Sequence, residues 1–208
     1  MYFERDGVYK PIGKGCQIID FENEDLTTPE NERIIDELIF DMKKHRGEII
    51  SNSVDIEFLL NESIGIFFFG KPSDDYNIFL NSILQKEFFT FAEKMNLLNY
   101  LLTNHPDRYL NIGNKKRKEI ITLIREIMEY RNKYAHPDIT IKFKERKAYI
   151  IDKKGNNLLS QESIDAFHKK FRHLTIRLSA LIVSRMYKIK DKTLDDMTTD
   201  FDNALNAQ

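Results

Sequence analysis

The stretch from residue 52 to residue 69 is apolar on almost all sides, and it constrains the fold more than any other part of the sequence. Its few polar residues include Asp55, Glu57, Asn61 and Glu62, and it ends in three consecutive phenylalanines. A helix that is hydrophobic all round has to be covered by other elements, so it is normally central to a bundle. The sequence therefore predicts a mainly α fold built around this segment.

Capping residues and apolar periodicity predict the other helices. Thr28-Pro29-Glu30 is typical of a helix start. We expect that helix to run to about Lys44, with Gly47 as a joint before the central helix. Further helices are expected at 76–84, at 88–103, at 114–136 and from Ser160 onward, and residues 195–208 are expected to form a weak acidic helix or a tail.

Two short segments are expected to be extended. Alternating apolar residues at 139–143 and 148–151 predict a β-hairpin with a turn near Glu145 and Arg146. A second extended stretch is expected around residues 17–19. The fold class is thus a helical bundle of four to five helices with one small β-hairpin after the helix that ends near residue 136.

The same patterns suggest a division of the chain into three parts. Residues 1–45 are expected to be a leader and a helix that pack on the domain, residues 46–190 the helical domain, and residues 191–208 an acidic C-terminal helix or tail. No tract of about eighteen apolar residues is present, and the first ten residues do not resemble a secretory signal. The single cysteine, Cys16, excludes an internal disulfide and a cysteine-built zinc site. We therefore expect a cytoplasmic protein.

The net charge of −1 hides a strong asymmetry along the chain. Residues 107–192 hold 22 Lys and Arg against 10 Asp and Glu, whereas the remainder holds 10 against 23. A positive half attracts polyanions such as RNA, and the run Lys115-Lys116-Arg117-Lys118 is the densest cluster. The alternative is that these charges are solvated helix and hairpin faces balanced by the acidic half.

The candidate site lies where the 114–136 helix ends. Apolar residues recur at Ile120, Ile124 and Ile127, and Arg131 occupies the next position of this stripe. A guanidinium on an inward face is costly unless an anion meets it. His136 follows just before Pro137, which disrupts the helix and allows the imidazole to turn toward the arginine. The alternative is a structural arginine paired with Asp55, Glu57 or Glu62.

Arg131-Asn132-x-x-Ala135-His136 resembles the Arg-x4–6-His motif of the HEPN (higher eukaryotes and prokaryotes nucleotide-binding) domain family. Residues 55–62 are similar to the first core helix of that family, and residues 88–98 resemble its second. The resemblance covers about residues 50–136 well and 160–187 loosely, whereas residues 1–45 lie outside it.

This resemblance implies a homodimer with a composite active site and a metal-independent endoribonuclease, in which the RNA 2′-hydroxyl attacks the neighbouring phosphate. His136 is expected to move the proton, Arg131 to bind the phosphate, and Asn132 to orient the imidazole or bind phosphate. Glu57, Asp55 and Asn61 are expected to support the site. Lys133 and the run at 115–118 are expected to bind RNA.

The family also suggests a toxin or antiviral setting, with a cognate antitoxin or regulatory protein as a possible partner. Asp138 stands where some members carry a tyrosine modified by a partner nucleotidyltransferase, so that form of regulation is not indicated. The alternative function is a non-catalytic dimer that binds a nucleotide or a partner protein. No cofactor and no metal site are expected, because the histidines are not spaced with acids as ligands, and Gly13-Lys14-Gly15 is too short for a phosphate loop.

Overall fold

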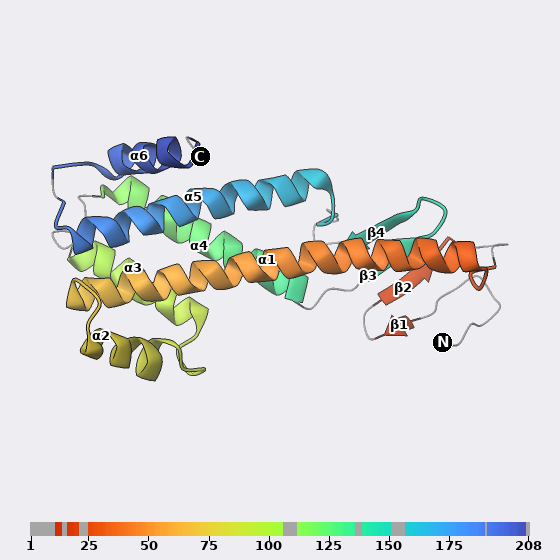
Figure 1. The fold of residues 1–208 in the computed structure, drawn as a ribbon, viewed down its shortest axis with the longest axis horizontal. Coiled ribbons are helices and arrows are strands. Elements are labelled where there is room, and N and C mark those ends of the chain that lie inside the picture. The colour runs from red at the N-terminus through yellow and green to blue at the C-terminus, as the bar shows by residue number, and fades with distance from the viewer. Residues whose placement is uncertain are drawn as a thin grey trace. The chain divides into compact units, whose positions relative to one another are not determined.

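The computed structural model describes residues 11–13, 16–20, 25–105, 112–135, 139–150, 157–189 and 191–206, and it confirms a mainly α fold with a small hairpin (Figure 1). Its elements, in chain order, are β1 (Pro11–Gly13), β2 (Cys16–Ile19), α1 (Pro29–Phe69), α2 (Asp74–Phe79), the π-helical turn η1 (Leu80–Leu84), α3 (Phe91–Asn104), α4 (Asn114–Ala135), β3 (Ile139–Lys142), β4 (Lys147–Ile150), α5 (Gln161–Met186) and α6 (Leu194–Asn206).

Helix α1 is one uninterrupted helix of 41 residues, so the joint predicted at Gly47 was wrong. A glycine costs a helix interior about 1 kcal/mol relative to alanine, and the apolar face of α1 continues on both sides of it. That face is buried at Met42, Ile49, Ser53, Ile56 and Leu60. The predicted start is confirmed, because the Thr28 side chain accepts a hydrogen bond from the Asn31 amide at 3.3 Å.

The other predicted helices are present with small changes at their ends. The predicted 76–84 helix is α2 continued by η1, and Ser73 caps its start. Helix α3 begins at Phe91, where Thr90 and Glu93 form a reciprocal capping box. The acidic segment near the end of the chain forms α6, whose Leu194 and Met197 are buried.

The predicted hairpin is confirmed, and it belongs to a four-stranded sheet of order β1-β2-β3-β4. Strands β3 and β4 pair antiparallel, and Arg146 takes a positive φ of 50° in the turn between them. Strand β2 contains the predicted extended stretch, and it pairs in parallel with β3, with Cys16 opposite Ile139. This pairing of distant segments was not predicted.

The chain divides into two compact units that differ from the predicted domains. Unit 1 comprises residues 1–51 and 130–168, and unit 2 comprises residues 52–129 and 169–208. Helix α1 continues through residue 45, and α6 belongs to unit 2. The division predicted at residues 45 and 190 stays a prediction. Helices α1, α4 and α5 each contribute one segment to each unit.

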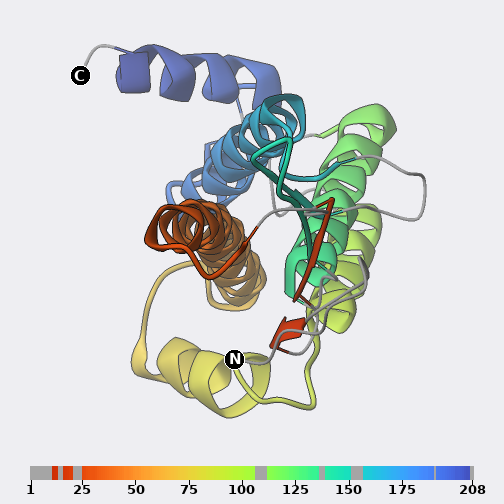
Figure 2. The same ribbon diagram turned by 90° about the vertical axis from the view of Figure 1, so that its right-hand side faces the viewer.

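Figure 2 shows the ribbon with α1 seen nearly end-on. Within unit 2, the helices are joined by polar contacts as well as by their apolar faces. The guanidinium of Arg117 on α4 donates to the Asn99 side chain on α3 at 2.9 Å. Arg185 on α5 donates to the backbone carbonyl of Phe67 on α1 at 3.3 Å. Within the described ranges, no helix combines the length and the apolar character needed to cross a membrane.

Candidate functional site

The last turn of α4, in unit 1, carries the residues that the sequence singled out. The apolar stripe of α4 is buried at Ile120, Ile124 and Ile127, and it ends at Tyr134, whose side chain is completely enclosed. Arg131 lies on this stripe between Ile127 and Tyr134 and is half-buried, as its spacing predicted. Its neighbour Asn132 is exposed.

This end of α4 is held by contacts with other parts of unit 1. The Tyr134 hydroxyl donates to the backbone carbonyl of Leu158, and burial raises the pKa of this phenol. The ring of Tyr130 lies 5.4 Å from the ring of Phe167 on α5. The carbonyl of Ala135, the last residue of α4, accepts a hydrogen bond from Arg46 Nη2 at 2.7 Å. The turn that carries Arg131 is therefore anchored at its side chains and at its backbone.

The side chain of Arg131 makes no hydrogen bond and no ion pair with any residue in the part of the chain that the structure describes. Two of the carboxylates considered as structural partners have other partners. Glu57 lies 2.5 Å from the Lys94 ammonium, and Glu62 accepts a hydrogen bond from the Tyr76 hydroxyl. The third, Asp55, is exposed. The reading of Arg131 as half of an internal salt bridge is therefore not supported by the described residues.

His136, the histidine of the motif, and Asp138 lie outside the described residues, so the convergence of the Arg131 guanidinium and the imidazole stays a prediction. Lys133 is exposed, and its ammonium lies 5.9 Å from the centre of the Tyr130 ring, a cation–π arrangement.

The three residues predicted to support the site lie in unit 2 and have different surroundings. Lys94, which the sequence analysis did not single out, is buried, and it engages the carboxylate of Glu57. Asn61 is buried one helical turn after Glu57, and its Oδ1 has no hydrogen-bond partner among the described residues. Asp55 is on the surface. Their predicted action on the Arg131 site stays a prediction.

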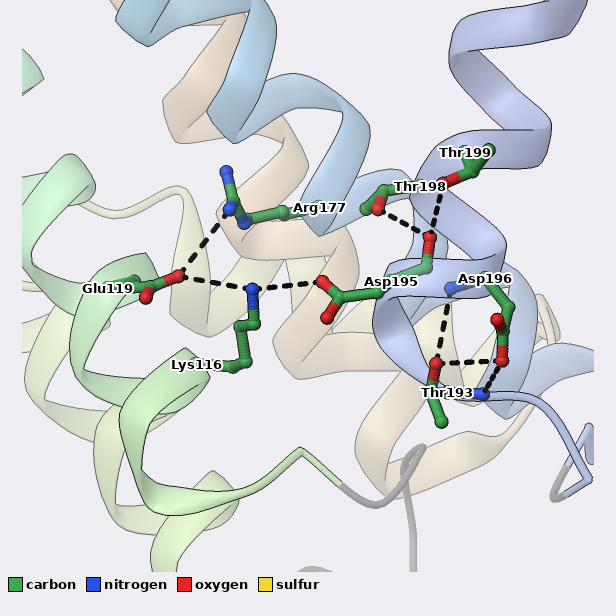
Figure 3. Close-up of polar contacts among 8 residues, drawn as sticks. All are labelled: Lys116, Glu119, Arg177, Thr193, Asp195, Asp196, Thr198 and Thr199. Carbon is green, nitrogen blue, oxygen red and sulfur yellow. Dashed lines mark hydrogen bonds and ion pairs between the residues drawn. The ribbon is translucent and has the colours of Figure 1, made fainter.

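The four cations at 115–118, at the start of α4, differ in their surroundings: two contact neighbouring helices and two are exposed. Lys116 Nζ lies 3.0 Å from Asp195 on α6 and 3.7 Å from Glu119, and Arg177 on α5 approaches the same Glu119 oxygen at 3.5 Å (Figure 3). Arg117 is likewise engaged, by Asn99 and Thr103 of α3. These two cations therefore connect helices within unit 2.

Lys115 and Lys118 are exposed, and neither forms an ion pair with a described residue. They are the members of the run that are available to a polyanion. Lys133, in unit 1, is also exposed on this helix.

Arg46 is the residue of this region that sequence reasoning missed. It lies on the half-buried side of α1, next to His45, and both interrupt an otherwise apolar stripe. That interruption was the available signal, but the joint predicted at Gly47 placed this stretch at the end of a helix, where polar residues are ordinary.

No group of three or more His, Cys, Asp and Glu side chains suited to a metal ion occurs among the described residues. A scan against protein-family models, a search of curated proteins and a search of solved structures each find no match for this chain.

Proposed function

We propose that this protein is a metal-independent endoribonuclease of the HEPN type, with Arg131, Asn132 and His136 as its active site. One observation carries the proposal. Arg131 presents a half-buried guanidinium at an anchored helix end, and no described carboxylate neutralises it. Such a group is costly to leave without an anion, and its planar fork matches the oxygens of a phosphate.

The proposed reaction assigns one task to each residue. His136 removes the proton of the RNA 2′-hydroxyl, whose oxygen attacks the adjacent phosphorus, and the bond to the 5′-oxygen breaks. The leaving oxygen takes a proton from the protonated His136 of a second copy of the chain. Arg131 binds the phosphate oxygens and stabilises the charge that grows on them. The products are a 2′,3′-cyclic phosphate and a 5′-hydroxyl.

The exposed cations of α4 supply the less specific part of substrate binding in this proposal. Lys115, Lys118 and Lys133 contact backbone phosphates, and each contact makes binding more sensitive to salt. Lys116 and Arg117 are not assigned this task, because acids and amides of neighbouring helices engage them.

The test is RNA cleavage by the purified full-length chain in the presence of EDTA, with the ends of the products identified chemically. His136→Ala and Arg131→Ala should each lower the cleavage rate by about a hundredfold or more. Arg125→Ala, an exposed arginine on the same helix, and His173→Ala, an exposed histidine on α5, are the matched controls and should cleave normally. All four variants should keep the melting temperature within a few degrees of the wild type.

Two results would contradict the proposal. One is cleavage that persists in His136→Ala, which would indicate a contaminating nuclease. The other is a wild-type chain that binds RNA or a nucleotide through Arg131 but leaves RNA intact, which would support the non-catalytic alternative instead.

A further inference from the structure

The end of α4 is held by a cation from a segment far away in the sequence. Arg46 Nη2, in the middle of α1, donates to the carbonyl oxygen of Ala135 at 2.7 Å. The last four carbonyls of a helix have no donor within the helix, and they form the negative end of its dipole. A guanidinium is therefore a well-matched cap, and a charged donor makes the hydrogen bond stronger than a neutral one.

Arg46 lies within a continuous helix, and no ion pair with a described residue balances its charge. Helix α1 continues through this region without a break. Two residues later, Glu48 lies 3.5 Å from His168 Nε2 on α5, so the same turn of α1 also contacts a second helix of unit 1. Arg46 forms no ion pair with any residue within the described ranges. Arg33, on the same helix, does form an ion pair, because its Nη1 lies 3.8 Å from Oε1 of Glu37.

The carbonyl that Arg46 caps belongs to Ala135, a residue of the Arg131–His136 motif. Ala135 is one helical turn after Arg131, on the same face, and it is bonded directly to His136. We propose that Arg46 is a positioning residue for the Arg131–His136 site. By holding the Ala135 carbonyl, it fixes the last turn of α4, which carries Arg131. This inference rests on the proposed ribonuclease function, which it extends by one residue.

The experiment compares Arg46→Met, Arg46→Lys and Arg33→Met in the full-length chain. Methionine keeps most of the aliphatic part of the side chain but removes its charge and its donors, whereas lysine keeps the charge and an ammonium group that can donate. Arg33→Met makes the same chemical change on the same helix at an exposed position. Two quantities are measured: hydrogen exchange of the amides of residues 131–135, and kcat and KM for RNA cleavage.

Arg46→Met should speed amide exchange in the last turn of α4 by about tenfold, because a charged hydrogen bond has been removed. It should lower kcat by about tenfold to a hundredfold while KM changes little. The reason is that Arg131, on the turn that loses its anchor, acts in the reaction step. Arg46→Lys should restore most of both losses. Arg33→Met should resemble the wild type in both measurements.

The outcomes separate this inference from the proposed function. Unchanged exchange in Arg46→Met overturns the inference, whatever the chain does to RNA. Faster exchange with an unchanged kcat also overturns it, because the anchored turn would then not matter for the reaction. A wild type that does not cleave RNA refutes the ribonuclease proposal, and the exchange data alone then decide whether Arg46 anchors this turn.

Discussion

Replacing Gly65 by alanine tests how tightly α2 packs on α1. A Cβ atom at position 65 would lie 2.6 Å from Cε2 of Tyr76 and 3.1 Å from Cδ2 of Leu80. Real Cβ atoms essentially never come as close to another carbon as 2.6 Å, so the Tyr76 ring or the backbone at Gly65 has to move. The Tyr76 ring cannot move easily, because it is buried and its hydroxyl is hydrogen-bonded to Glu62.

The magnitude follows from comparison with Gly47 on the same helix. A Cβ atom at Gly47 would meet nothing within 4 Å, so Gly47→Ala should stabilise the protein by about 1 kcal/mol through helix propensity alone. Gly65→Ala gains the same propensity but adds overpacking strain of about 1–3 kcal/mol. The two variants should therefore differ in their free energy of unfolding by about 1–3 kcal/mol, with Gly65→Ala the less stable.

Urea unfolding of both variants measures this difference directly. Tyr76→Leu provides a further check, because removing the ring should remove most of the penalty of Gly65→Ala in the double variant. Equal stability of Gly65→Ala and Gly47→Ala would refute the argument, and it would mean that α2 is not seated on α1 at this glycine.

Three further outcomes follow from contacts described above. Glu57→Gln leaves the buried Lys94 ammonium without its partner and should cost about 3 kcal/mol in urea unfolding, most of which Lys94→Met should recover in the double variant. Because burial raises the pKa of Tyr134, the unfolded chain loses a proton above about pH 10 that the folded chain keeps. The free energy of unfolding should therefore fall as the pH rises beyond 10, and Tyr134→Phe should reduce that fall. Asp195→Asn removes the nearer of the two carboxylates that contact Lys116 (Figure 3) and should tighten binding of a homopolymer RNA about two- to fivefold relative to Asp191→Asn, which removes the same charge. Equal affinities, measured by fluorescence anisotropy, would show that the α6 contact does not compete with RNA.

Local patterns predicted most of the helices and the hairpin, because apolar periodicity and capping act over a few residues. The stripe of α4 is an example, since its spacing placed Arg131 on the half-buried face where the structure has it. Gly47 misled the same reasoning. The low helix propensity of glycine is outweighed by the burial of apolar residues on both sides of Gly47, and helix propensity takes no account of that burial.

Contacts between distant segments could not be predicted in this way. Nothing near β2 indicates that its partner is β3, and nothing near Arg46 indicates that it caps α4. The run at 115–118 shows the same limit. Its four cations are alike in sequence, and only the placement of α3 and α6 separates Lys116 and Arg117 from Lys115 and Lys118.

The parallel pairing of β2 with β3 has a consequence for how the chain is made. A ribosome adds about 5–20 residues per second, so β2 has to wait roughly ten seconds before its neighbour has been synthesised. During that interval the early strand offers an unsatisfied edge, and closing so long a loop is entropically slow. Unit 1 therefore cannot be completed until residues 139–142 have been synthesised, and until then β2 lacks its parallel neighbour.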